Sequence, residues 1–309
     1  MNKAIQYIQA HILEETENTA LFYMIIGGFS FATMGAMTHA LGQYTDWVLI
    51  VVIRMFTTFV LTVSAAFKSG INPFLFTRPL LWFRSIIGSG AMLATFYALI
   101  HLPISDVSVI TETRPIWVAL LAGFVLGETP GRSIWFSIFL GIVGVILIEN
   151  PHIAQKNYAA LIALLASILG SIVMICLRKL RDLDPKVIVT QFSGTATLVG
   201  IILLLFFRDL PNIQTLYSWK VILMLAGVGI FGTFGQLSMT KAFSLGQAPT
   251  VSTAGLLKVG FSAMYDLVIW GYVFQFSSAL GMILILGSTA WLFGSNAIRL
   301  GRKSDESQD

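Results

Sequence analysis

The sequence predicts an all-α polytopic membrane protein with ten transmembrane helices, arranged as two inverted repeats of five helices each. Three observations support this prediction: the chain is strongly apolar, it contains ten apolar runs of membrane-spanning length, and its two halves resemble each other. Of the 309 residues, 56% are hydrophobic and 11% are charged. In a typical soluble domain, about 25% of the residues are charged.

This composition excludes several classes of protein. A soluble globular enzyme, a disordered chain and a nucleic-acid-binding protein with a basic face all need more charged residues than this chain has. The single cysteine, Cys176, excludes a disulfide framework and a cysteine-based zinc site. The sequence has no cluster with metal-ligand spacing and no activated nucleophile. We therefore expect no metal, no cofactor, no nucleic-acid partner and no enzymatic activity.

Ten runs of about 20 apolar residues are long enough to cross the hydrocarbon core of a bilayer. The linkers between them are short and leave no room for a domain outside the membrane. Turn-forming sequences mark most of the breaks: Gly42–Asp46, Asn72–Pro73, Leu102–Pro103, Thr129–Gly131, Asn150–Pro151, Asp184–Pro185, Pro211–Asn212 and Gly246–Pro249. The expected spans are residues 21–41, 46–67, 80–100, 105–126, 133–150, 157–177, 186–207, 219–240, 249–272 and 277–297.

The distribution of positive charge predicts the orientation. Lysine and arginine gather on one side of the expected topology: Lys68, Arg78, Arg84, Arg132, Arg178, Lys179, Arg181 and Lys186, with Arg299, Arg302 and Lys303 near the C-terminus. Cytoplasmic loops are enriched in these residues, so we expect both termini in the cytoplasm and residues 299–309 as a cytoplasmic tail. Residues 1–20 form an N-terminal cytoplasmic segment in which Ile5, Ile8 and Ile12 lie at helical spacing. This spacing predicts an amphipathic helix on the membrane surface, with a frayed terminus as the alternative.

The chain repeats itself at an offset of 144 residues. Gly88–Ser89, Tyr97–Leu99, Ser105 and Val107 align without a gap with Gly232–Thr233, Lys241–Phe243, Pro249 and Val251. Each half, residues 21–150 and 151–298, therefore holds five spans. Because five is an odd number, the second half enters the membrane from the opposite face and the repeats are inverted. Inverted repeats around a site near the membrane midplane are typical of secondary transporters.

Several motifs along the chain resemble one known family. They are Arg54, Arg84, Phe96–Leu99, Leu102–Ser105, Pro115, Leu126–Glu128 and Gly141–Val145. On these residues the chain resembles the drug/metabolite transporter (DMT) superfamily, specifically its EamA-type ten-helix members. The resemblance implies a bacterial inner-membrane protein in which spans four and nine, joined by spans one, three, six and eight, surround a central cavity. Two positions depart from the family pattern: Val259, where the family often has proline, and Tyr272, where it often has an acid.

Five ionisable residues lie well inside the expected spans and are candidates for function. They are Arg54, Glu112, Arg114, Lys258 and Asp266. Each charge costs roughly 2.5–3.5 kcal/mol in the centre of a bilayer on insertion scales. These residues must therefore pair with one another, reach the interface or face water.

Two of these residues are equivalent in the repeat. Adding 144 to the number of Arg114 gives Lys258, so both cations occupy the same place, in spans four and nine. Two cations facing one cavity suit an anionic or zwitterionic solute. Alternatively they are structural, with Arg114 paired to Asp266 or Lys258 paired to Glu112.

Helical spacing selects the neighbours of these cations. In one continuous helix Glu112 would lie about 200° from Arg114, so the two side chains would point in different directions. Trp117 shares the face of Arg114, whereas Ser262 and Tyr265 share the face of Lys258. The expected substrate-binding residues are Arg114, Lys258, Tyr265, Trp117, Ser262 and Tyr97. Glu112 and Asp266 are either proton carriers or fixed counter-ions.

These observations favour a secondary active transporter that moves an amino acid, or a related zwitterionic or anionic solute, across the inner membrane by alternating access. The expected partners are a small-molecule solute and the lipid bilayer, and protons are the candidate coupling ion. Alternatives are an uptake carrier for a nucleoside-type metabolite such as S-adenosylmethionine, and a drug or metabolite efflux pump. A non-transport membrane subunit and a membrane-embedded enzyme are the alternatives from other classes.

Overall fold

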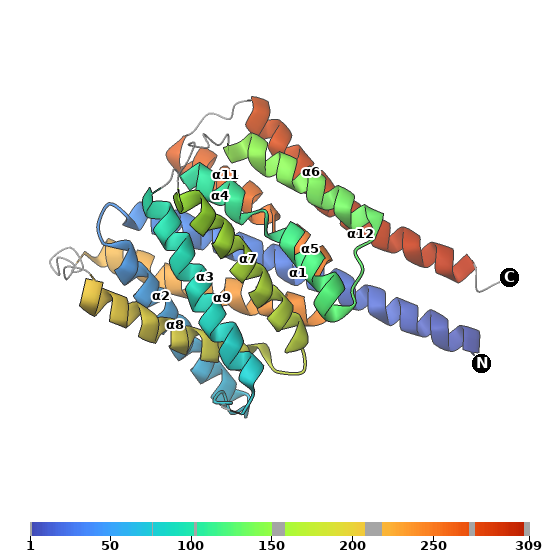
Figure 1. Cartoon of the computed structure of the whole chain (residues 1–309), viewed down its shortest axis with the longest axis horizontal. Coiled ribbons are helices and arrows are strands. Elements are labelled where there is room, and N and C mark those ends of the chain that lie inside the picture. Colours follow the sequence, from blue (N-terminus) through green and yellow to red (C-terminus); the bar gives the residue numbers. More distant parts are fainter. Residues whose placement is uncertain are drawn as a thin grey trace.

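The computed structural model describes residues 2–75, 77–101, 104–149, 158–207, 218–271 and 276–305, and every regular element in these ranges is an α-helix. The helices are shown in Figure 1. Their bounds are α1 Asn2–Leu41, α2 Trp47–Lys68, α3 Pro79–His101, α4 Ile104–Thr111, α5 Arg114–Leu126, α6 Arg132–Glu149, α7 Tyr158–Lys179, α8 Pro185–Phe207, α9 Trp219–Leu245, α10 Ala248–Ala254, α11 Leu257–Trp270 and α12 Phe276–Asp305.

These helices confirm the ten expected spans. Eight spans are single helices, whereas α4 and α5 share the fourth span and α10 and α11 share the ninth. Within the described residues, five helical segments are long and apolar enough to cross a membrane: 16–41, 48–68, 158–179, 185–206 and 219–245. All of α5 and parts of α6 and α12 form shorter apolar helices.

Local chemistry explains several helix ends. The carboxylate of Asp46 caps α2 by accepting a hydrogen bond of 2.8 Å from the N–H of Val48. Gly127 follows α5 with φ +67°, and Gly271 follows α11 with φ +66°. Glycine adopts this left-handed conformation without a steric penalty. The two glycines are 144 residues apart, so the repeat seen in the sequence extends to the helix caps.

The two terminal segments are helical. Residues 2–15 continue directly into the first span within α1, and α12 continues through residues 299–305. Figure 1 shows that both helices extend beyond the bundle at the same end. The two ends of the chain lie on one side, as an even number of membrane crossings requires. How residues 1–20 meet the membrane surface stays a prediction.

The packing of the helices follows the inverted repeat. The first span, α1, packs against α9 and α11, whereas the first span of the second half, α7, packs against α3, α4 and α5. Each half therefore sends its first span into the other half. The remaining pairs are also equivalent: α2 packs against α8, and α6 lies along α12 (Figure 1). The core is consequently shared between the two repeats.

Gly144 allows a close contact between α6 and α12. A Cβ atom at Gly144 would lie 2.6 Å from the carbonyl oxygen of Gly281 and 2.8 Å from Cγ1 of Ile285. Small residues at such positions let the backbones of membrane helices approach. The carbonyl oxygen belongs to the backbone of α12, so it cannot move unless the whole helix shifts.

We predict that Gly144→Ala destabilises the protein by about 1–3 kcal/mol, because overpacking at a rigid contact forces the backbones apart. Gly123→Ala is the matched control, because a Cβ at Gly123 meets nothing within 4 Å. Thermal unfolding of the purified protein in lipid nanodiscs measures both variants. Equal melting temperatures for the two variants would show that the α6–α12 contact is not tight.

Candidate functional site: two interrupted helices and a buried ion pair

The fourth span is interrupted in its middle. α4 ends at Thr111, and α5 begins at Arg114 with proline at its second position. Pro115 has no N–H, so it cannot donate to the carbonyl of Thr111 four residues earlier. Instead the hydroxyl of Ser167 on α7 donates a hydrogen bond of 3.3 Å to the carbonyl of Thr111. The span is present, but it is not the continuous helix on which the predicted angle between Glu112 and Arg114 depends.

The ninth span is interrupted at the equivalent place. α10 ends at Ala254 and α11 begins at Leu257. Around this break, backbone N–H groups donate hydrogen bonds to carbonyls three residues earlier. They run from Leu256 to Thr253 at 3.1 Å, from Lys258 to Gly255 at 3.1 Å and from Val259 to Leu256 at 3.0 Å. Position 256 is Glu112 plus 144, so both halves break at the same point. The second break forms without a proline, since Val259 stands at the position equivalent to Pro115.

An ion pair joins the two interruptions. The ammonium of Lys258 donates a hydrogen bond to Oε1 of Glu112. The Glu112 side chain is 10% exposed and that of Lys258 is 36% exposed, so the carboxylate is the more deeply buried partner. The pair connects the first repeat to the second. It is one of the two pairings expected if the cations are structural.

Arg114 lies beside this pair with hydrogen-bonding capacity to spare. Its guanidinium lies over Gly170 on α7, where a Cβ would come within 2.7 Å of Nε. Nε is buried and has no hydrogen-bond partner among the described residues. Glu112 is also within electrostatic reach of Arg114. Among the described side chains, Lys258 and Arg114 therefore share the carboxylate of Glu112.

The polarity of the half-helices adds to this positive potential. Arg114 is the first residue of α5 and Lys258 is the second residue of α11. The N-terminus of a helix carries a partial positive charge. Placing a cation there is locally unfavourable, and local conflicts of this kind are typical of functional sites. An anion would relieve the conflict at both helices.

Aromatic side chains accompany both cations. The indole Nε1 of Trp117 donates a hydrogen bond of 3.3 Å to the hydroxyl of Thr113. The hydroxyl groups of Tyr265 and Thr33 are 2.6 Å apart. Gly28 brings α1 close to the same helix, since a Cβ there would lie 3.5 Å from the backbone nitrogen of Lys258. Trp117 is thus held within the interrupted span, and Tyr265 is held by α1.

The remaining predicted residues are less tightly placed. Ser262 is half-buried on α11, and Tyr97 on α3 is 43% exposed. The backbone of Asp266 belongs to α11, but its side chain lies outside the described part of the structure. The alternative pairing of Arg114 with Asp266 therefore stays a prediction. Arg54 lies against Gly232, and its Nε is buried without a partner among the described residues.

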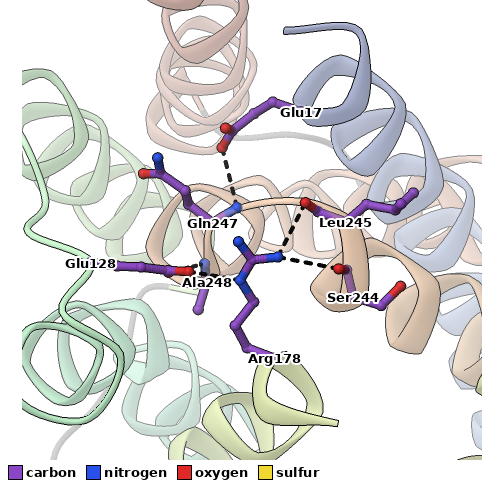
Figure 2. Close-up of polar contacts among 7 residues, drawn as sticks. All are labelled: Glu17, Glu128, Arg178, Ser244, Leu245, Gln247 and Ala248. Atoms are coloured by element: carbon purple, nitrogen blue, oxygen red, sulfur yellow. Dashed lines mark hydrogen bonds and ion pairs between the residues drawn. The ribbon is translucent and has the colours of Figure 1, made fainter. Parts of the chain in front are cut away.

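A second polar cluster was missed by the sequence reasoning. We call it the Arg178 network; it consists of Glu17, Glu128, Arg178, Ser244, Leu245, Gln247 and Ala248 (Figure 2). Nε of Arg178 donates a hydrogen bond of 2.7 Å to Glu128. The two side chains are 13% and 16% exposed. Their positions are 50 residues apart, and neither position alone indicates the pairing.

Comparison with known proteins identifies the family. The model of the EamA-like transporter family matches residues 18–149 and 157–294, which are the two halves found in the sequence. The chain therefore belongs to the EamA-like transporter family. It is an integral, multi-pass membrane protein and a transporter of small metabolites.

Individual relatives have different solutes. The chain is 27% identical to the pseudopaline exporter CntI of Pseudomonas aeruginosa over 211 residues, covering 67% of this chain and 72% of that protein. It is 29% identical to an uncharacterized transporter of Helicobacter pylori, covering 67% and 70%. The riboflavin transporter of Vibrio cholerae is 24% identical, covering 58% and 59%. A solved crystal structure with 15% identity matches with a TM-score of 0.77 over 90% of this chain and 97% of that chain, and this likeness shows the same fold.

The buried ion pair makes a testable contribution to stability. Removing Glu112 alone leaves both Lys258 and Arg114 without this carboxylate, and breaking a fully buried pair in this way typically costs about 3–5 kcal/mol. Removing Lys258 as well takes away one of the two cations and so relieves most of the imbalance. We predict that Glu112→Gln lowers the melting temperature strongly and that Glu112→Gln with Lys258→Gln recovers most of the loss. The measurement is thermal unfolding in nanodiscs, analysed as a double-mutant cycle. A double variant no more stable than Glu112→Gln would show that the two residues do not interact.

Proposed function

We propose that this protein is a secondary active transporter that moves a small zwitterionic or anionic metabolite, an amino acid or a close derivative, by alternating access. The proposal rests on the environment of the Arg114 guanidinium. The side chain is half-buried at the interruption of the fourth span, its Nε is buried with no partner among the described residues, and it lies beside the Lys258–Glu112 pair. A desolvated cation with free donors is a binding site for an anionic group.

The charges of the site match a zwitterion. A carboxylate of the solute would accept hydrogen bonds from Arg114, whose planar fork suits two oxygen atoms. The ammonium group of the solute would compete with Lys258 for Glu112, because both are cations facing one carboxylate. Displaced from Glu112, Lys258 would be free to bind the solute carboxylate as well. Binding would thus exchange one ion pair for another and leave the net charge of the site unchanged.

The aromatic and hydroxyl groups would surround the organic part of the solute. Trp117 lies on α5 with Arg114, Tyr265 lies on α11 with Lys258, and Ser262 and Tyr97 complete the predicted set of lining residues. Tyr265 bonds to Thr33 on α1, so solute contact with this ring would be transmitted to the first span. Asp266 stays a candidate for proton coupling or charge compensation.

The location of the site supports alternating access. Interrupted helices at the interface of two inverted repeats commonly form the binding site of secondary transporters. In this chain the two interruptions meet through residues of different halves. Rocking one half against the other would expose the same residues to each side in turn. We also propose that the protein resides in the inner membrane with both termini in the cytoplasm, as the positive-inside rule predicts.

Export is the second candidate, because one relative is named an exporter. The direction of net transport depends on the coupling ion and its gradient, and protons are the candidate. Counterflow does not depend on the direction, since it needs only exchange of labelled for unlabelled solute.

The test is counterflow in proteoliposomes with a panel of zwitterionic, anionic and cationic metabolites. We predict flux of a zwitterion or an anion, and a loss of at least about 100-fold in Arg114→Gln, because a buried charge-assisted contact typically contributes several kcal/mol. Arg114→Lys should recover little, because lysine lacks the planar fork. Arg132→Gln is the matched control, since Arg132 lies at the start of α6, away from the two interruptions.

Two outcomes would contradict this assignment. Selective flux of cations would show that Arg114 and Lys258 have a purely structural role. Undiminished flux of a zwitterion in the double variant Arg114→Gln with Lys258→Gln would show that the solute binds elsewhere.

A further inference from the structure

The Arg178 network ties the ends of several helices together at the end of the bundle where α5 ends and α10 begins. Arg178, in the last turn of α7, donates from Nη1 to the carbonyls of Ser244 and Leu245, each at 3.2 Å. These carbonyls terminate α9. Glu128, just after α5, accepts a hydrogen bond of 2.9 Å from the N–H of Ala248, the first residue of α10. Figure 2 shows that the two charged side chains meet between these helix ends.

The charges suit the helix termini that they contact. The C-terminus of a helix carries a partial negative charge and exposes carbonyls, and the N-terminus carries a partial positive charge and exposes N–H groups. The guanidinium of Arg178 lies at the C-terminus of α9, and the carboxylate of Glu128 lies at the N-terminus of α10. Glu17 adds α1 to the network by accepting a hydrogen bond of 3.3 Å from the N–H of Gln247. The contacts are therefore stabilising only with the charges in this arrangement.

The opposite end of the bundle lacks the equivalent acid. The repeat relates Gly127 to Gly271, and both adopt the same left-handed conformation. The next residue is Glu128 in the first half but Tyr272 in the second. Tyr272 itself lies outside the described residues, but a tyrosine carries no charge near neutral pH. The position equivalent to Glu128 in the second repeat therefore cannot supply the acid of such an ion pair.

The same helices connect this network to the candidate binding site. α5 begins with Arg114 and ends beside Glu128, a distance of about 20 Å along the helix. α7 contacts Arg114 at Gly170 and ends with Arg178 and Lys179. α10 begins at Ala248 in the network and ends at the interruption next to Lys258. A movement of these helices at the site therefore changes the contacts of the network.

We propose that the Arg178 network is a one-sided lock, so that the empty protein rests closed at the Glu128 end and accepts solute from the opposite end. When the lock opens, α5 and α7 move apart from α9 and α10. The hydrogen bonds of the network break once in each transport cycle. This inference rests on the proposed function, since it assigns the resting state of the same carrier. It adds that the two inverted halves are energetically unequal.

The lock can be tested without any solute, so an incorrect substrate class leaves the test intact. Spin labels at Arg181→Cys, after α7, and Lys241→Cys, on α9, report the separation of the two sides. The chain is purified in nanodiscs in a Cys176→Ala background, because Cys176 is the single native cysteine. Double electron–electron resonance then measures the distribution of distances between the labels. We expect one short-distance population in the protein without further substitutions.

Glu128→Gln should increase the long-distance population at least tenfold, because it removes the charge while keeping the size of the side chain. Arg178→Gln should have the same effect, which provides a second variant if the first folds poorly. The matched control is Arg78→Gln, which breaks the exposed Arg78–Asp182 pair of 2.9 Å and should leave the distribution unchanged. Unchanged distributions in both Glu128→Gln and Arg178→Gln would overturn the proposal.

A charge exchange tests the contribution of the helix termini. In Glu128→Arg with Arg178→Glu, the ion pair can re-form, but each charge then faces the wrong helix end. We expect the exchanged variant to remain largely open. Recovery of the closed population would show that a simple ion pair, rather than the arrangement of helix ends, holds this end shut.

Discussion

The ion pair between Lys258 and Glu112 is the interaction on which the rest of the arrangement depends. It joins the interruption of the fourth span to that of the ninth, and through it the two inverted halves meet at charged groups. Buried charges in a membrane are tolerated only when they are paired or face water. Among the described side chains, Lys258 and Arg114 share the carboxylate of Glu112, and Nε of Arg114 has no hydrogen-bond partner. In the proposed function, the same feature that constrains the fold provides the binding site for an anionic group.

The interruptions also allow local binding chemistry to move whole segments. A half-helix is short enough to move as a rigid body, and each one leads from the centre of the bundle to one of its ends. α5 and α10 reach the same end, where Arg178 and Glu128 contact free helix termini. The opposite end has Tyr272 at the position that corresponds to Glu128. Symmetry in the backbone therefore coexists with asymmetry in the charges at these two equivalent positions.

Much of this architecture is predictable from the sequence, and the rest is not for identifiable reasons. Long apolar runs define the spans, and the offset of 144 residues alone is enough to relate Arg114 to Lys258. The interruptions escape notice because an apolar run looks the same whether or not the helix breaks. Pro115 is a signal for one break, but the other is made by tight backbone bonds around Leu256. The Arg178–Glu128 pair depends on contacts between distant segments, which a single sequence does not reveal.

Hydrogen–deuterium exchange of the protein in nanodiscs tests the central claim most directly, because it reports on both interruptions at once. The amides of residues 110–116 and 254–260 should exchange faster than the rest of their spans in the empty protein. Addition of a transported zwitterion or anion should slow exchange at both interruptions together, since both would contribute to one site. Protection at only one interruption, or at neither, would contradict the account.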